Sequence, residues 1–324
     1  MSGPITIDDV HRAAERIRPH LSPTPLRDYA PLDAVVGGDI RVLVKHENHQ
    51  PTNAFKVRNG VSAVAALDEG ARRRGVIAAT RGNHGAGLAW AARRFGVACV
   101  VVVPHGNNRE KNAAIRGFGA ELVEAGVDYD ESVATAEELT RSRGLTIVHS
   151  TNDRDVLAGA GTLSLEIVQA APELDAMVVA VGGGSQAVGA LTVARALAPK
   201  LRVYGVQAAG AAAMHDAVKS GQPRTYDRAD TFADGIATRA PYAMTYPALR
   251  EGLAGFVTVS DGEIAAAMRT LLSTTHQLVE GAGAAGLAGL VKLRDELAGR
   301  RVAIVLSGGN VDLPTLRRVV TEAL

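Results

Sequence analysis

Short apolar runs rich in valine and isoleucine recur along the chain. They occupy 75–80, 98–104, 145–150, 176–182, 202–207 and 301–307. Within each run apolar and polar positions alternate little, which is typical of strands covered on both faces of a sheet. Alanine-rich stretches with helical spacing, such as 85–96 and 185–198, lie between the runs. This succession of strands and helices predicts parallel sheets built from βαβ units.

The amino-terminal stretch predicts a helix of its own. "TIDDVHRAAERI", at 6–17, has the pattern of an amphipathic helix, with Thr6 as its N-cap and Asp9 in its first turn. The two prolines of "LSPTPL", at 21–26, break that helix. No basic start followed by an apolar core is found here, so we expect no signal peptide.

Composition excludes several classes of protein. A chain of 324 residues with 47% hydrophobic and 21% charged residues is typical of a soluble globular protein of about two domains. Lys+Arg 35 against Asp+Glu 34 leaves a formal charge of +1, and we expect no nucleic-acid partner. No apolar run reaches the roughly 18 residues of a membrane span, so we expect no membrane partner. The one cysteine, Cys99, is predicted to be a small buried hydrophobe, which fits a cytoplasmic location.

Glycine, with 35 residues, gathers in loops that follow the predicted strands. The first of these loops is "TRGNHGAG", at 80–87. Gly82 and Gly85 allow the backbone to approach a ligand closely, and Asn83 and His84 offer polar groups at a helix N-terminus. A plain helix cap explains this loop equally well, because asparagine is a favoured N-cap residue.

Two further loops follow strands in the same way. "VGGGSQAVG", at 181–189, places three glycines and Ser185 at a helix start, where backbone N–H groups and the helix dipole favour a phosphate. This loop matches neither the G-x-G-x-x-G pattern nor a P-loop, which argues against a dinucleotide or ATP site. A plain strand–helix turn would need fewer glycines, so a phosphate site is favoured over a simple turn. "SGGNVD", at 307–312, places the hydroxyl of Ser307 at the end of a buried strand, although this could be a simple turn.

Lys56 stands in "PTNAFKVRNG", where Arg58 is the only other charged residue. A phosphate-binding loop, a serine at a strand end and a lysine are the parts of a site for a phosphorylated cofactor that a lysine holds covalently. Partial desolvation helps such a lysine to lose its proton. Pyridoxal phosphate (PLP) fits, because it has one phosphate, one ring nitrogen and an aldehyde.

The segments "NAFKVRNG", "TRGNHG", "GGGS" and "SGGN", in this order, resemble the fold-type II PLP enzymes. The resemblance is greatest to the threonine/serine dehydratase (ammonia-lyase) and serine racemase branch, and runs from "TPL" at 24–26 through "VEGAGAAGLAGL" at 279–290 to "SGGNVD". It implies an α/β fold like that of the tryptophan synthase β chain, with two three-layer αβα domains and mainly parallel sheets. A large PLP-binding domain would comprise 1–65 and 149–324, with a small substrate-binding domain, 66–148, inserted in it. The resemblance also implies a homodimer.

The resemblance implies roles for individual residues. Lys56 would be the catalytic residue and would form a Schiff base with the cofactor. The other cofactor-binding residues would pack beside the ring (Phe55), bond to the ring hydroxyl (Asn83), hold the phosphate (Gly182, Gly183, Gly184 and Ser185) and meet the pyridine nitrogen (Ser307). The substrate-binding residues would lie in the first glycine loop, where the substrate carboxylate is received: Thr80, Arg81, Gly82, Asn83 and His84.

The activity implied is that of a PLP-dependent carbon–oxygen lyase of the threonine/serine ammonia-lyase type. It would convert a β-hydroxy amino acid such as L-threonine or L-serine to a 2-oxo acid and ammonia. The freed amine of Lys56 would take the Cα proton. Since Ser307 is neutral, it does not force the ring nitrogen to be protonated, which favours prompt loss of the β-hydroxyl.

Two charged residues leave alternatives open. Arg81 occupies the position at which serine racemases of the family carry a serine acid/base, and a guanidinium that stays protonated cannot replace it. Arg81 could instead bind a second substrate carboxylate, as in 3-hydroxyaspartate, or turn to solvent or to the phosphate. Glu280, in "LVEGAG", could line the cofactor pocket or cap the helix that follows.

The metal site of the family is expected to be absent. The positions of its acidic ligands hold Gln207, Ala211 and Ala213, whereas hard cations prefer carboxylate oxygens. His215, next to Asp216, is expected to be a surface residue rather than a ligand.

Other activities also stay open. The first alternative is a dehydratase for another β-hydroxy amino acid, of the 3-hydroxyaspartate or phenylserine type, followed by a serine racemase. A non-catalytic PLP-binding protein is another class, although it would not need Lys56, Asn83 and Ser307 together. A cysteine synthase-type replacement enzyme usually has aspartate and arginine after the lysine, whereas here Val57 precedes Arg58.

Overall fold

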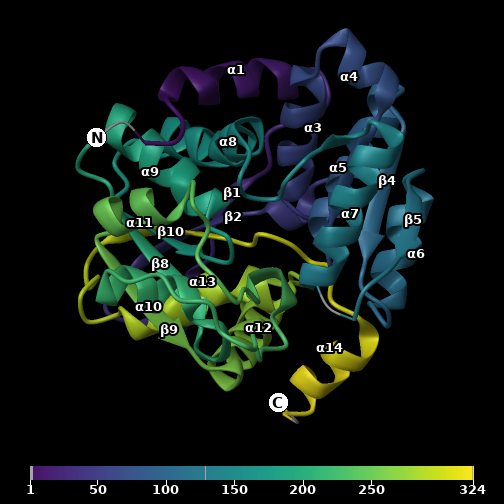
Figure 1. Ribbon diagram of the computed structural model, residues 1–324. Helices are drawn as coiled ribbons and strands as arrows, with labels where there is room; N and C mark the ends of the chain where they lie inside the picture. Colours follow the sequence, from purple (N-terminus) through teal and green to yellow (C-terminus); the bar gives the residue numbers. More distant parts are fainter. Residues whose placement is uncertain (1–2, 128, 323) are drawn as a thin grey trace.

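The computed structural model describes residues 3–127, 129–322 and 324. The chain folds around two sheets, which stand side by side with helices packed on them (Figure 1). No helix of the described part is long and apolar enough to cross a membrane. The predicted α/β class with mainly parallel sheets is confirmed.

The larger sheet has the strand order β1-β2-β10-β7-β8-β9. Only the pair β1 and β2 is antiparallel. The strands are β1 (Leu26–Asp28), β2 (Arg41–Lys45), β7 (Ala176–Ala180), β8 (Arg202–Ala208), β9 (Gly255–Val259) and β10 (Arg301–Val305). The helices outside the smaller sheet are α1 (Ile7–Ile17), α2 (Ala30–Val36), α3 (Lys56–Ala66), α8 (Arg154–Ala170), α9 (Ser185–Leu197), α10 (Ala213–Ser220), α11 (Tyr246–Gly252), α12 (Asp261–Thr275), α13 (Gly281–Lys292) and α14 (Leu313–Val320). The short 3-10 helices are η1 (Glu47–His49), η2 (Ala209–Ala211) and η3 (Asp234–Ile236).

The smaller sheet has the order β5-β4-β3-β6, and all its strands are parallel. They are β3 (Val76–Ala79), β4 (Cys99–Val103), β5 (Glu121–Glu124) and β6 (Thr146–Ile147). Helix α4 (Glu69–Arg74) precedes β3, and the helices between the strands are α5 (Asn83–Phe95), α6 (Arg109–Gly117) and α7 (Tyr129–Arg143). We call residues 69–147 the small half and the rest of the chain the large half. The domain boundaries expected at 65/66 and 148/149 stay a prediction.

Alternate residues of the central strands enter different cores, so each sheet is covered on both faces. In β7, Val178 packs with α12 and α13, while Val179 packs with α8 and α9. In β3, Ala78 packs with α3 and α5, and Ile77 packs toward α7. Both halves therefore have a layer of helices on each side of a sheet, which explains the near-continuous apolar runs.

Most predicted elements are found close to their expected bounds. The six apolar runs contain β3, β4, β6, β7, β8 and β10, and the expected N-terminal helix is α1, capped by Thr6 in a box with Asp9. The run at 145–150 was expected to be one strand, but β6 ends at Ile147, and the next residues turn toward the interior between the halves. The sequence pattern did not reveal β1, β2, β5 or β9, because these short strands alternate in burial or carry polar residues.

Helices α3, α5 and α8 approach one another closely through glycines. A Cβ added at Gly60 would lie 2.4 Å from the carbonyl oxygen of Gly87, and one added at Gly87 would lie 2.5 Å from that of Lys56. A Cβ at Gly159 would lie 2.7 Å from the carbonyl oxygen of Arg58. Real Cβ atoms do not approach backbone this closely, so side chains at these positions would push the helices apart.

A buried ionic cluster holds the first turn of α3. The guanidinium of Arg58 donates to both carboxylate oxygens of Glu47, at 2.8 Å each, and to those of Glu166, at 2.6 and 2.9 Å. The Nζ atom of Lys45 lies 2.5 Å from Glu166 Oε2. Burial works against the charge of Glu47, but Arg58 holds the pKa of this carboxyl below its usual value. Glu47 and Arg58 therefore stay charged inside the protein, where each depends on the other.

We expect Gly60→Ala to lower the free energy of unfolding by about 2 to 3 kcal/mol, because its methyl group must displace the backbone of α5. Urea denaturation measures this change. Gly117→Ala is the control, since a Cβ there meets no described atom within 4 Å, and it should change stability by less than about 1 kcal/mol. Equal stability of the two variants would contradict the close packing of α3 on α5.

Candidate active site

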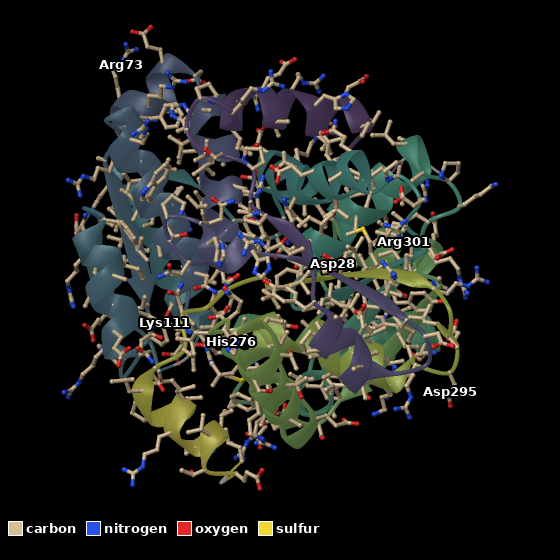
Figure 2. All side chains as sticks on the ribbon, turned by 180° about the vertical axis from the view of Figure 1, so that it is seen from behind. Asp28, Arg73, Lys111, His276, Asp295 and Arg301 are labelled. Carbon is tan, nitrogen blue, oxygen red and sulfur yellow. The ribbon has the colours of Figure 1, made fainter. Side chains whose placement is uncertain are left out.

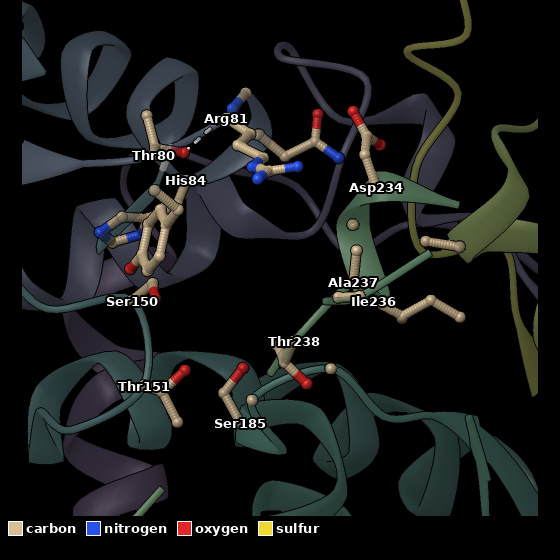
Figure 3. A pocket seen from close by; sticks show the side chains of 18 of the residues that line it. Thr80, Arg81, His84, Ser150, Thr151, Ser185, Asp234, Ile236, Ala237 and Thr238 are labelled. Carbon is tan, nitrogen blue, oxygen red and sulfur yellow. Dashed lines mark hydrogen bonds between the residues drawn. The ribbon is translucent and has the colours of Figure 1, made fainter. Parts of the chain in front are cut away.

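A cavity of about 600 Å³ lies between the two halves. Its walls come from the loops that follow β3, β6, β7 and β10, and from the segment 225–242. Every site residue expected from the sequence lines it: Phe55, Lys56, Thr80, Arg81, Gly82, Asn83, His84, Gly182, Gly183, Gly184, Ser185 and Ser307. Figure 3 shows Arg81 and Asp234 toward one end of the cavity, and Thr151 and Ser185 toward the other. The structure thus brings the predicted residues together, while their individual roles stay predictions.

Lys56 is the first residue of α3, and its amine reaches the cavity. The Nζ atom donates to the carbonyl oxygen of Ser150 and to Ser185 Oγ, both at 3.3 Å, and lies 5.1 Å from the centre of the Phe55 ring. No carboxylate among the described residues pairs with it. Burial lowers the pKa of Lys56 to about 8. A substantial fraction of the amine is therefore neutral near pH 7.5, as an amine nucleophile or base requires.

The three glycines before α9 form a cradle for an anion. A Cβ added at Gly183 would lie 2.1 Å from Thr151 Oγ1, and Gly184 has a φ of +96°, which favours glycine. The hydroxyl of Thr245 donates to the carbonyl oxygen of Gly183 at 2.6 Å and fixes the turn. No side chain of the described residues caps α9, so its first N–H groups stay available to a ligand.

Asn83 is the first residue of α5 and is held by two residues of the large half. Its Nδ2 donates to Glu280 Oε1 at 2.6 Å, and its Oδ1 accepts from Asn310 Nδ2 at 2.8 Å. The second oxygen of Glu280 is buried and has no partner among the described residues. Glu280 therefore lines the cavity and does not cap α13, which settles the alternative left open by the sequence.

Two polar contacts join α6 to the large half, one of them in the wall of the cavity. The amine of Lys111, in α6, lies 2.5 Å from Asp234 Oδ2, in η3. Asn108, the N-cap of α6, donates to Oδ2 of Asp312, the N-cap of α14, at 2.5 Å. In the reverse view Lys111 lies near α14, where the halves meet (Figure 2). Burial raises the pKa of Glu280 to about 7, although the charge of Lys111 opposes this.

The loop after β3 is shaped by its own polar groups. Thr80 Oγ1 accepts from the backbone N–H of Gly82 at 3.0 Å, and Nε2 of His84 lies 2.9 Å from the carbonyl oxygen of Val148. Burial lowers the pKa of His84 to about 3, so this ring is neutral and bound to backbone. Arg81 is exposed, and no described residue forms a hydrogen bond or ion pair with its guanidinium.

The sequence did not reveal several residues of the cavity. In the sequence, Lys111 and Asp234 do not directly follow a strand, so a prediction based on strand ends did not include them. His149, Ser150 and Thr151 lie two to four residues after β6, so the rule that ligands bind at the carboxyl ends of parallel strands could have identified them. The predicted strand extended to residue 150, so His149 and Ser150 were assigned to the strand and not to the loop that follows it.

The segment expected to lack a metal site has other contacts. Gln207 Oε1 accepts from the backbone N–H of His215 at 2.9 Å, and the ring of His215 bonds to Asp216 at 2.8 Å. His215 was expected at the surface but is half-buried, because its ring packs edge-on against Phe256. Across the described ranges, no group of three or more His, Cys, Asp or Glu side chains could hold a metal ion.

These features fit pyridoxal phosphate. The glycine cradle and the uncapped α9 suit its phosphate, and the amine of Lys56 suits its aldehyde. The hydroxyl of Ser307, at the end of β10, and the amide of Asn83 can bond to the polar atoms of its ring.

Comparison with known proteins gives the same result. The family model described as "Pyridoxal-phosphate dependent enzyme" matches residues 17–308. The chain is 35% identical to the L-threonine ammonia-lyase of Thermotoga maritima, over 99% of this chain and 79% of that protein. It is 36% identical to the L-threo-3-hydroxyaspartate ammonia-lyase of a Pseudomonas species, over 94% of this chain and 95% of that protein. The crystal structure of serine racemase from Dictyostelium discoideum superposes with a TM-score of 0.89 at 30% identity, covering 96% of this chain and all (100%) of that one.

The order of motifs, the geometry of the cavity and these similarities agree. The chain belongs to the pyridoxal-phosphate dependent enzymes of fold type II, in the branch that contains ammonia-lyases and serine racemases, and pyridoxal phosphate is its cofactor.

Proposed function

We propose that this enzyme is an ammonia-lyase that converts a β-hydroxy amino acid of the L-threonine or L-serine type to a 2-oxo acid and ammonia. The amine of Lys56 carries this proposal, because it reaches the cavity, has no described carboxylate partner and has a pKa of about 8. The step at Cβ breaks a carbon–oxygen bond, and the overall reaction removes ammonia, which places ammonia-lyases among the carbon–nitrogen lyases. A homodimer and a cytoplasmic location are further proposals, which rest on the resemblance alone.

Different residues of the cavity serve different steps of the proposed reaction. The bound cofactor supplies an electron-withdrawing ring that acidifies the Cα proton of an amino acid joined to its aldehyde. The neutral amine of Lys56 takes that proton, with Ser150 and Ser185 orienting Nζ. The backbone amides beside Thr80 receive the substrate carboxylate at the start of α5.

Contacts between the halves keep water out during the reaction. Lys111 reaches from the small half to Asp234, and Asn83 reaches to Glu280. Separation of the halves would break these bonds, so they favour the closed arrangement in which Asn83 faces the cofactor. Exclusion of water limits side reactions and strengthens the charge interactions of the site.

A second candidate function is the dehydration of 3-hydroxyaspartate. Arg81 favours it, because this cavity residue has a guanidinium without a described carboxylate partner and can bind a second carboxylate in bidentate fashion. The similarity to the L-threo-3-hydroxyaspartate ammonia-lyase of Pseudomonas also supports this second candidate function. Serine racemase activity is less favoured, because Arg81 cannot serve as the second acid/base.

Lys56→Ala is expected to lower 2-oxo acid release from L-threonine and L-serine by at least about 1,000-fold, because the base at Cα is lost. A colorimetric assay of 2-oxo acid with PLP-loaded protein measures this. Lys219→Ala, at an exposed lysine of α10, should keep full activity. Release by the Lys56 variant at the wild-type rate would disprove the proposed role.

Arg81→Gln is expected to lower kcat/KM for L-threo-3-hydroxyaspartate by roughly 10 to 100 times more than for L-threonine, because only the acidic substrate offers a second carboxylate. Steady-state kinetics with both substrates measures this, and threonine serves as the internal control. Equal losses of kcat/KM with both substrates would show that Arg81 does not recognise the side chain of the substrate.

Glu280→Gln is expected to change how stability depends on pH. Burial raises the pKa of Glu280 from its ordinary value of 4.5 to about 7 in the folded protein, so the folded state holds its proton more tightly. Its contribution to stability is complete below about pH 4.5 and is lost as the pH rises through 7. As the pH rises from 5 to 8, the free energy of unfolding of the wild type should therefore fall by about 1 to 3 kcal/mol relative to that of Glu280→Gln.

Urea denaturation of the cofactor-free proteins at several pH values measures this difference. Glu138→Gln, at an exposed position of α7, is the control and should follow the wild type at every pH. A constant difference between the wild type and Glu280→Gln across this range would show that Glu280 does not take up a proton there.

A further inference from the structure

The ring of His149 is held in one tautomer by the backbone. Its Nδ1 atom accepts the N–H of Thr151 at 3.0 Å and the N–H of Asn152 at 2.8 Å. A backbone N–H can only donate, so Nδ1 must offer a lone pair and cannot carry a proton. In a neutral imidazole the proton then lies on Nε2.

The same two bonds keep the ring neutral. A second proton would have to enter at Nδ1, against two backbone N–H groups that point at this atom. Burial, and then the charge of Lys56, also lower the pKa of His149. His84 and Tyr242 are the other titratable groups that interact with this ring. The Nε2–H group is thus a fixed hydrogen-bond donor and not a strong acid.

This donor belongs to the wall of the cavity, close to the reacting lysine. His149 lines the cavity, and its ring packs edge-on against Tyr242 with 5.7 Å between the ring centres. The next residue, Ser150, accepts the hydrogen bond from Lys56 Nζ through its carbonyl oxygen. No residue in the described part of the chain accepts a hydrogen bond from Nε2, so this group is available to a substrate.

We propose that His149 donates a hydrogen bond through Nε2–H to the β-hydroxyl oxygen that leaves the substrate. This inference rests on the proposed function. Lys56 must reach the Cα proton, so Cβ and its hydroxyl come next to Nζ, in the part of the cavity that Ser150 and His149 line. A fixed donor stabilises the negative charge that develops on oxygen as the Cβ–O bond breaks.

Atoms and charges balance without proton transfer from His149. The electron pair of the Cα–H bond forms the new carbon–carbon double bond, and the pair of the Cβ–O bond leaves with oxygen. The proton that Lys56 removes and the departing hydroxide together account for the water lost. The nearby hydroxyls of Ser150 and Thr151 can rotate to donate or accept, whereas Nε2–H can only donate.

The kinetic test compares two leaving groups in the PLP-loaded enzyme. His149→Phe keeps an aromatic ring beside Tyr242 but removes the donor. With L-serine we expect kcat to fall roughly 10- to 100-fold. With β-chloro-L-alanine we expect a fall of less than about 3-fold, because chloride leaves as a stable anion without help from a donor. His149→Gln restores an N–H donor and should recover part of the activity with serine.

His215→Phe is the matched control, since this half-buried histidine packs against Phe256 away from the cavity lining. It should leave both reactions unchanged. Equal losses with serine and β-chloro-L-alanine in His149→Phe would overturn the inference and leave His149 a structural role.

The tautomer itself can be tested without turnover. Long-range ¹H–¹⁵N correlation spectra of the histidine-labelled enzyme, assigned by comparison with His149→Phe, should show the proton of His149 on Nε2 and a lone pair on Nδ1. A proton on Nδ1 would overturn the inference. Wild-type enzyme that acts on β-chloro-L-alanine but on no β-hydroxy amino acid would instead refute the proposed function, and the hydroxyl contact with it.

Discussion

The buried pairing of Arg58 with Glu47 and Glu166 is the interaction on which the active site most depends. Arg58 lies two residues after Lys56, in the first turn of α3, and its guanidinium joins this turn to η1 and to α8. Charged groups inside a protein are costly to bring there, and removal of one partner leaves the others uncompensated. The cluster therefore permits little freedom in the direction from which Lys56 enters the cavity.

Glycine contacts add to this constraint from the other side. The close approach of Gly60 and Gly87 brings α3 against α5, and α5 begins with Asn83. The lysine and the asparagine thus start two helices whose backbones meet directly at these glycines. Asn310 and Glu280 then fix the orientation of the Asn83 amide, because one donates to its oxygen and the other accepts from its nitrogen. Parallel strands complete the site by bringing the ends of β3, β6, β7 and β10 to one cavity.

The sequence revealed those features that depend on local pattern. The apolar runs identified central strands because these are covered on both faces, and the glycine loops pointed to the cavity because backbone must approach a ligand there. The order of the motifs around Lys56, Asn83 and Ser307 identified the family and the cofactor. Short strands such as β2 and β9 were not predicted, because five residues of mixed apolar and polar character cannot be told from a loop by sequence pattern.

Other features depend on contacts between distant segments and could not be read from the chain. Lys111 and Asp234 are 123 residues apart, and their pairing exists only when the halves meet. Glu280 precedes a helix, so a capping role was as reasonable as a place in the cavity until the bond to Asn83 was seen. The tautomer of His149 follows from two backbone N–H groups whose direction no sequence pattern encodes.

We infer that the amine of Lys56 and the surrounding cavity perform a β-elimination. The most direct measurement is the stoichiometry of products formed by the PLP-loaded wild type from L-threonine and from L-serine, with ammonia, 2-oxo acid and the D-amino acid determined in the same sample. A β-elimination should give ammonia and 2-oxo acid in a one-to-one ratio, with no accumulation of D-amino acid. Formation of D-serine without ammonia, or bound cofactor without any product from these or an acidic β-hydroxy amino acid, would contradict it.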